Sequence, residues 1–180
     1  MKLKIPAMLI SFVIVMSLLA SCSPASATTT KTDVVASASV VDNAADFEKA
    51  IAKDGTWIIA ITKDLTIDKE LVLDGDFKNG KKDTAGNELL QRKIALYTQD
   101  ADRNITARFT LAAKKMTVKS ANASIQHGTF KGDLYVDVKD FQLVDATVDG
   151  NVYFLNEDVK ASFTMDETSK ITGVQEILAN

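Results

Sequence analysis

Three short apolar segments recur in this chain at a constant spacing of 18 residues. They are Met-Thr-Val at 116–118, Leu-Tyr-Val at 134–136 and Val-Tyr-Phe at 152–154. Gly132 and Gly150 repeat with the same step. A fixed period is typical of folds in which each repeat is one structural unit that stacks on its neighbour. The repeat therefore constrains the topology more than any other feature of the sequence.

The alternation inside each segment indicates which side chains face inward. Residues i and i+2 of a strand lie on the same face, so Leu134 and Val136 point one way and Tyr135 points the other. Coils stacked about 4.8 Å apart would place Met116, Leu134 and Val152 in one apolar ladder. The outward tyrosines would stack in the same manner.

Looser spacing extends the ladder in both directions. Steps of 22 and 23 residues lead back to 94–96 and 71–73, and a step of 19 leads forward to 171–173. Two further columns keep the 18-residue step: Ala123, Phe141 and Val159, and Ile125, Leu143 and Ala161. We therefore predict an all-β fold, a single-stranded right-handed parallel β-helix of about five to six coils. The alternative is an antiparallel β-sandwich in which the 18-residue repeat arises by chance.

One amphipathic helix precedes the strands. Asp42 or Asn43 suits its N-cap, and Gly55 suits the residue after its end. The apolar residues Ala44, Phe47, Ala50 and Ile51 share one face at helical spacing. Because an exposed end of a β-helix needs a cap, we predict that this helix covers the N-terminal end of the core.

Two families resemble parts of this pattern. Residues 47–73 resemble the opening of right-handed β-helix proteins of the pectate-lyase-like superfamily, where a short Ala-rich helix ending in Gly leads into aliphatic strands. The 18-residue coils are similar to those of bactofilins, which are polymer-forming bacterial β-helices. The first resemblance implies acidic Ca²⁺ ligands and a basic residue acting on a sugar acid, and the second implies end-to-end assembly.

The N-terminus has the pattern of a targeting segment. Lys2 and Lys4 precede an apolar run over 5–19, as in secretory signal peptides. The following Leu-Ala-Ser-Cys at 19–22 resembles the lipobox of bacterial lipoproteins, which implies cleavage before Cys22 and its lipidation with acyl chains such as palmitate. We therefore predict a signal peptide over 1–21, a lipidated Cys22 with a flexible tether over 22–40, and a β-helix domain over 41–180. An ordinary signal peptide or an uncleaved anchor is the alternative.

Charge and cysteine content exclude several classes of protein. Without Lys2 and Lys4 the chain has 19 basic and 24 acidic residues, a net charge of −5. An acidic body without a basic cluster argues against nucleic-acid binding and against a polybasic membrane surface. Cys22 is the only cysteine, so no intramolecular disulfide can form. The predicted location is the bacterial cell membrane, with the domain lipid-anchored and exposed outside the cytoplasm.

Candidate ligand-binding residues lie on the outer face and in the longest polar segment. Tyr135 and Tyr153 would stack on neighbouring coils, and exposed aromatic rings in a row can serve as a platform for sugar rings. Lys78, Lys81 and Lys82 lie in the insertion 78–93 and could bind an anionic glycan or a phosphate-rich wall polymer. The alternatives are outward packing beneath a loop for the tyrosines and a solvated loop for the lysines.

Calcium is the one cofactor for which the sequence offers candidates. Asp100 and Asp102 place carboxylates at i and i+2, which can suit Ca²⁺. Asp140 and Asp158 align with Asn122 in a polar column under the 18-residue step. Hydrated turns are the alternative in both places. His127, the only histidine, is predicted to be a turn or surface residue.

No catalytic motif is visible, so three functions remain. The preferred one is a non-catalytic lipoprotein that binds or presents an envelope or extracellular ligand, such as a glycan. The alternatives are a self-assembling structural subunit and a small polysaccharide lyase or hydrolase. The sequence does not set the oligomeric state.

Overall fold

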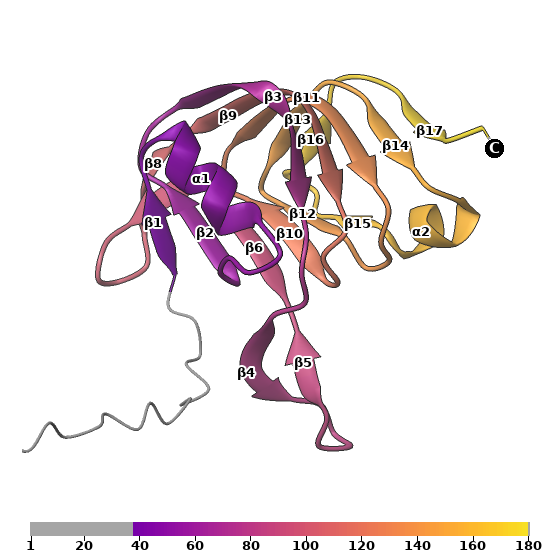
Figure 1. Cartoon of the computed structure of the whole chain (residues 1–180), viewed down its shortest axis with the longest axis horizontal. Coiled ribbons are helices and arrows are strands. Elements are labelled where there is room, and N and C mark those ends of the chain that lie inside the picture. The colour runs from indigo at the N-terminus through magenta and orange to yellow at the C-terminus, as the bar shows by residue number, and fades with distance from the viewer. Residues whose placement is uncertain (1–37, 180) are drawn as a thin grey trace, which may run out of the picture. The chain divides into compact units, whose positions relative to one another are not determined.

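The computed structural model describes residues 38–179. The predicted signal peptide, Cys22 and the tether up to residue 37 lie outside them. The chain is all-β, and its two main sheets are parallel (Figure 1). Parallel pairing throughout both sheets excludes the antiparallel sandwich.

Six strands form the first sheet, here called sheet A, and seven form sheet B. In spatial order, sheet A contains β1 (Ser39–Val41), β2 (Ile58–Ile61), β6 (Arg92–Ala95), β10 (Ala123–Gln126), β12 (Gln142–Val144) and β15 (Thr164–Met165). Sheet B contains β3 (Leu65–Leu73), β9 (Thr110–Val118), β11 (Thr129–Val136), β13 (Thr147–Asp149), β14 (Val152–Phe154), β16 (Lys170–Ile171) and β17 (Gln175–Ile177). After β1 and the first helix, the chain passes from one sheet to the other repeatedly, and each new strand pairs with a strand of the preceding passage. β1 begins at Ser39, two residues before the predicted start of the domain.

The 18-residue ladder is confirmed between β9, β11 and β14. Leu134 pairs with Met116 on one side and with Val152 on the other, and Leu71 of β3 extends the ladder. All four side chains are at most 2% exposed. The apolar core is therefore continuous across the coils, because every inward position of these strands holds an aliphatic or aromatic residue.

Two antiparallel hairpins interrupt the regular spacing. β4 (Lys78–Lys82) pairs with β5 (Glu88–Leu90), and β7 (Tyr97–Gln99) pairs with β8 (Ile105–Arg108). They flank β6, so the step from Leu71 to Met116 becomes 45 residues. The predicted place of Ile94 in the Leu71 ladder is wrong, because Ile94 belongs to sheet A, between Ile59 and Ile125.

A second helix changes the register near the C-terminus. α2 (Glu157–Ser162) begins where the Asn156 side chain accepts a hydrogen bond from Val159 N at 2.9 Å. The predicted strand columns through Val159 and Ala161 are therefore wrong. β15 pairs with β12 so that Thr164 lies opposite Gln142, four residues beyond the position that the 18-residue step predicts. Phe163 stacks with Phe141 at a ring-centroid distance of 6.0 Å. The predicted forward step to Ile171 is also wrong, since Ile171 pairs with Val148 at a step of 23 residues.

The first helix covers the N-terminal end of the core, as predicted. α1 (Ala44–Ile51) begins after Asn43, whose side chain accepts a hydrogen bond from Asp46 N at 3.0 Å. Its inward face buries Phe47, Ala50 and Ile51 in the same core as the strands. A helix of eight residues is too short to persist alone, so this burial stabilises it.

A fully buried arginine joins this helix to the sheets. Arg92, 0% exposed, donates hydrogen bonds to the backbone carbonyls of Ala50, Ala52 and Asp74, at 2.7, 3.1 and 2.7 Å. Its guanidinium also lies 3.9 Å from the centre of the Phe77 ring. Burial lowers the pKa of Arg92 to about 10, which leaves the side chain charged at neutral pH.

Glycine allows the backbones of neighbouring coils to approach closely where β11 bends. Gly132 has a φ of +141°, and a Cβ there would lie 1.9 Å from the carbonyl oxygen of Ala113. A Cβ on Gly150, in the next coil, would lie 2.1 Å from the oxygen of Gly132. The recurrence of glycine at this step therefore has a steric cause.

Candidate functional site

A column of side chains along the outer face of sheet B holds the two candidate tyrosines. In register across the coils lie Val72, Thr117, Tyr135, Tyr153 and Glu176. The tyrosine rings have a centroid separation of 4.9 Å and an interplanar angle of 36°. The structure thus brings Tyr135 and Tyr153 together, as the 18-residue step predicts.

The ring faces of this pair are turned along the column rather than outward. Coplanar rings placed side by side cannot approach to 4.9 Å, so the faces of Tyr135 and Tyr153 overlap. Lys115 Nζ, from the preceding coil, lies 4.5 Å from the centre of the Tyr135 ring and covers its other face. A ligand approaching from solvent would therefore meet ring edges and phenol groups. This geometry differs from the flat sugar platform that the sequence suggests.

Polar groups flank the tyrosines. Asp133 Oδ1 accepts hydrogen bonds from the backbone N and the side-chain Nδ2 of Asn151, at 3.1 and 3.0 Å. Desolvation, followed by the negative charge of Asp133, raises the pKa of Tyr153. Lys115 also forms an ion pair with Glu70 at 3.5 Å. The Tyr153 phenol therefore stays protonated at neutral pH and can donate a hydrogen bond.

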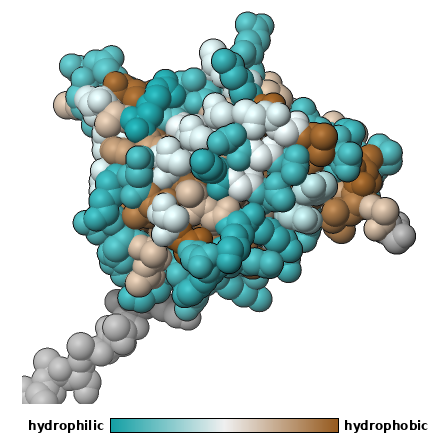
Figure 2. Space-filling model, turned by 90° about the horizontal axis from the view of Figure 1, so that it is seen from above, coloured by the Kyte–Doolittle hydropathy of each residue, from teal (hydrophilic) through white to brown (hydrophobic). Residues whose placement is uncertain are grey.

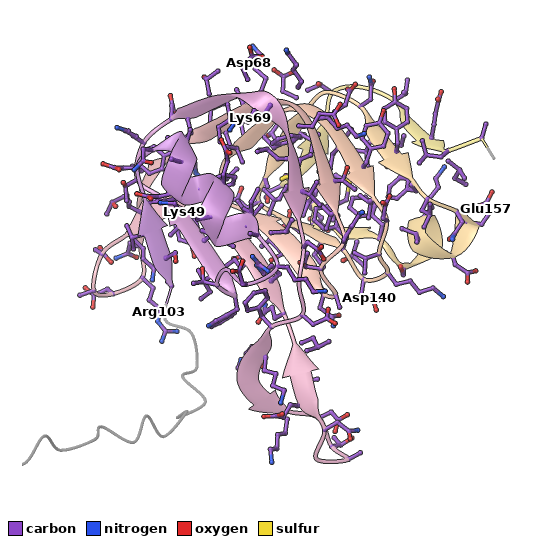
Figure 3. All side chains as sticks on the ribbon, viewed as in Figure 1. Lys49, Asp68, Lys69, Arg103, Asp140 and Glu157 are labelled. Atoms are coloured by element: carbon purple, nitrogen blue, oxygen red, sulfur yellow. The ribbon has the colours of Figure 1, made fainter. Side chains whose placement is uncertain are left out.

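A shallow groove of about 510 Å³ adjoins this column on the same face. Its lining includes Gly132 and Gly150, where the backbones of neighbouring coils approach closely. Charged side chains line it: Asp68, Lys114, Lys131, Asp133 and Asp149. Asp68, labelled at the upper edge of Figure 3, forms an ion pair with Lys114 at 2.7 Å. Seen from above, the surface is mainly hydrophilic with small separate hydrophobic patches (Figure 2).

The candidate lysines lie on the β4–β5 hairpin, which extends away from the two main sheets (Figure 1). Lys78 forms an ion pair with Glu88 of the facing strand. Lys81 and Lys82 are exposed. The predicted protrusion is confirmed for 78–90, which forms an ordered hairpin, but it is wrong for residues 92 and 93, which belong to β6 of sheet A. It is a feature separate from the tyrosine column.

The candidate Ca²⁺ carboxylates at 100 and 102 lie in the β7–β8 turn. Asp100 Oδ1 accepts hydrogen bonds from the backbone N of Asp102 and of Asn104, at 3.0 and 2.8 Å, and Asn104 Nδ2 donates to Oδ2. Asp83 and Asn87 close the β4–β5 turn with the same set of bonds. The recurrence favours a turn-closing role for Asp100.

The second acidic pair, Asp140 and Asp158, is not stacked as predicted. Asp158 lies in α2 and accepts a hydrogen bond from Lys139 Nζ at 2.9 Å, whereas Ser162 Oγ accepts one from Asp140 N. Asp140 lies at the lower edge of the sheets in Figure 3. Within residues 38–179, no group of three or more His, Cys, Asp or Glu side chains is placed to hold a metal ion.

His127 lies in a cluster of polar and aromatic side chains that the sequence pattern does not predict. His127 and Asp145 occupy stacked corners with φ values of 58° and 48°, and His127 Nδ1 lies 3.0 Å from Asp145 Oδ2. Arg108 Nη2 donates to the same carboxylate oxygen at 2.5 Å, and Tyr97 packs edge-on against the imidazole at 4.6 Å. The predicted turn position of His127 is confirmed. The 18-residue separation of His127 and Asp145 was the signal that could have revealed the pair.

We expect Asp145 to make stability depend on pH in acid. Hydrogen bonds from Arg108 and then His127 lower the pKa of Asp145 from 3.8 to about 2. The folded state therefore holds the proton less tightly than the unfolded state, and the stabilisation is present above about pH 4 and lost as pH falls toward 2. Because the ion pair is partly exposed, its expected size is about 1 kcal/mol.

Urea unfolding of Asp145→Asn at pH 7 and pH 2 measures this contribution. The variant should be less stable than the parent at pH 7 and equal to it at pH 2. Asp54→Asn, which removes an exposed carboxylate, is the matched control and should not change either value. An equal deficit for Asp145→Asn at both pH values would assign the effect to packing instead of charge.

Comparisons with known proteins give no relative. No protein-family model matches the chain, and neither a curated protein nor a solved structure shows significant similarity to it. Within residues 38–179 there is no helix long and apolar enough to cross a membrane.

Proposed function

We propose that this protein is a non-catalytic, membrane-anchored lipoprotein whose domain is a right-handed parallel β-helix. The repeated passage between two parallel sheets and the 18-residue register support this fold. The sequence over 19–22 supports attachment through lipid on Cys22. Within this proposal the domain is a rigid body that presents its outer surface to ligands outside the cytoplasm.

The proposed ligand is a glycan of the envelope or its surroundings, bound along the outer face of sheet B. One observation carries this proposal: Tyr135, Tyr153, Asp133 and Asn151 form a joined polar and aromatic surface beside an open groove. Phenol, carboxylate and amide groups are suitable partners for sugar hydroxyls. Because strands on both sides hold these residues, they need little reorganisation on binding.

Tyr135→Ala combined with Tyr153→Ala should abolish glycan binding. Loss of the two phenols and their ring edges removes the central contacts, so we expect affinity to fall at least about tenfold. The measurement is a glycan and wall-polymer array on the full chain, followed by titration of each positive ligand. Gln142→Ala, an exposed change on the outer face of sheet A, is the control and should bind normally.

Two results would contradict the proposal. One is an array without any binding to the parent protein. The other is binding that the double tyrosine variant retains in full. Circular dichroism of the variant separates lost contacts from lost fold, since these side chains lie outside the core.

A structural role is the second candidate, and the ends of the sheets favour a limited form of it. β15, β16 and β17 lie at one end, where their outer edges pair with no strand among residues 38–179. At the other end α1 buries Phe47 and Ile51 over the core. Unpaired edges can template pairing with another chain. Continued stacking would require α1 to leave its place, so this geometry favours pairs over filaments.

A further inference from the structure

A small cavity lies on the opposite outer surface, that of sheet A. It has a volume of about 340 Å³ and is bounded by β1, β2 and β6 on one side and by β7 on the other. Its apolar lining comes from Val40, Ile58, Ala60, Ala95 and Tyr97. Small-molecule sites are usually concave, mainly apolar and at least about 300 Å³ in volume. The cavity therefore meets the minimum requirements of a ligand site.

The strands of sheet A leave apolar side chains facing solvent at this place. Outward positions of an exposed sheet are normally polar, but Val40 is 68% exposed and its register neighbour Ala60 is also apolar. Ala95, the next residue in the row, is 4% exposed because β7 covers it. The apolar strip is thus continuous from an open end at Val40 to a covered end at Tyr97.

A lysine lies in the lining of the same cavity. Lys93 projects from β6 on the outer face and is half-buried, and its ammonium forms no ion pair or hydrogen bond with any of residues 38–179. Desolvation, followed by repulsion from Lys81 of the β4–β5 hairpin, lowers the pKa of Lys93. A half-buried ammonium without an ionic partner in the lining of a cavity favours an anion beside it.

We propose that this cavity binds a single-chain amphiphile with a carboxylate head, such as a medium-chain fatty acid. The tail would lie along Ile58, Ala60 and Ala95, and the carboxylate would lie at Lys93. The volume has room for one short chain and is too small for a two-chain lipid. An apolar strip with an uncompensated cation beside it, at Lys93 opposite Ile58, matches this ligand in both shape and charge.

Calorimetric titration of dodecanoate into the full chain tests the proposal. Cys22→Ser in this protein prevents attached acyl chains from competing. The parent should bind dodecanoate more tightly than dodecanol and should bind dodecylamine least, all below their micelle concentrations. Lys93→Gln should weaken dodecanoate about tenfold and leave dodecanol unchanged, because only the head contact is lost.

Two further variants complete the design. Ala60→Trp fills the cavity from a half-exposed position and should abolish binding of both dodecanoate and dodecanol. Lys119→Gln, at an exposed lysine away from the cavity, should bind like the parent. The proposal is overturned if dodecanoate does not bind, if dodecylamine binds equally well, or if Lys93→Gln has no effect. The Tyr135 and Tyr153 variants should bind dodecanoate normally, which separates this site from the proposed glycan surface.

Discussion

Arg92→Met is expected to cost about 3 kcal/mol of unfolding free energy and about 10 °C in Tm. Methionine fills much of the same volume but cannot donate to the carbonyls of Ala50, Ala52 and Asp74. A buried acceptor that loses its donor retains the full cost of its desolvation. The stacking of the guanidinium on Phe77 is lost as well.

Two features keep the expected loss of unfolding free energy in Arg92→Met from being larger. Ala50 and Ala52 carbonyls also accept backbone hydrogen bonds, from Thr56 and Gly55, so they stay partly satisfied. Arg92 Nε has no hydrogen-bond partner within residues 38–179, and methionine removes that unsatisfied donor. The measurement is urea unfolding followed by circular dichroism, with Lys119→Met as the exposed control.

Arg92→Lys distinguishes charge from geometry. Lysine keeps the positive charge, but one ammonium cannot reach three carbonyls that a planar fork contacts together. We expect most of the loss to remain in this variant. A lysine variant as stable as the parent would mean that charge alone holds α1 to the sheets.

Gly132→Ala is expected to destabilise the protein by about 3 kcal/mol or more. Its φ of +141° lies in a region that is essentially restricted to glycine, which alone costs about 1–3 kcal/mol for another residue. The new Cβ would also overlap the Ala113 oxygen at 1.9 Å, so β9 and β11 must separate locally. Urea unfolding of the variant measures the sum of both effects.

Two other glycines separate these causes. Gly86 has a φ of +88° with nothing within 4 Å of a Cβ, so Gly86→Ala isolates backbone strain and should cost about 1 kcal/mol. A Cβ on Gly150 would lie 2.1 Å from the Gly132 oxygen, without a positive φ, so Gly150→Ala isolates the overlap. If Gly132→Ala costs no more than Gly86→Ala, the close approach of the coils does not limit stability.

The sequence predicts the fold best where the coils have equal length. Between Met116 and Val152 the corners add no residues, so the 18-residue step gives the true register. It fails at Ile94 because two hairpins flank β6, and a period cannot show which sheet receives the strand between them. It also fails after Asn156, where an N-cap followed by Glu157 and Asp158 signals a helix that the periodic pattern obscured.

The candidate sites, too, were predictable only where they depend on the regular 18-residue spacing. The adjacency of Tyr135 and Tyr153 depends on the step alone and was predictable. Lys115 pairs with Asp133 at the same 18-residue step, but the contact of its ammonium with the Tyr135 ring depends on side-chain conformation, which the pattern does not reveal. The cavity beside Lys93 forms because β6 lies in sheet A and β7 lies beside it. The sequence pattern assigned the strand through Ile94 to the Leu71 ladder, so it could not predict this cavity.

The unequal lengths of the coils also predict the order in which the strands pair during folding. Pairing β9 with β11 or β11 with β14 closes chain segments of about 18 residues, whereas pairing β3 with β9 closes one of about 45. Closure entropy and the time for contact formation both increase with sequence separation. The central coils therefore have the lowest entropic barrier to association. We expect β2 and β3, whose partners β6 and β9 are about 35 and 45 residues away, to dock on central coils that have already associated. The strands that α1 covers are thus expected to be completed late in folding, although they lie near the start of the folded part of the chain.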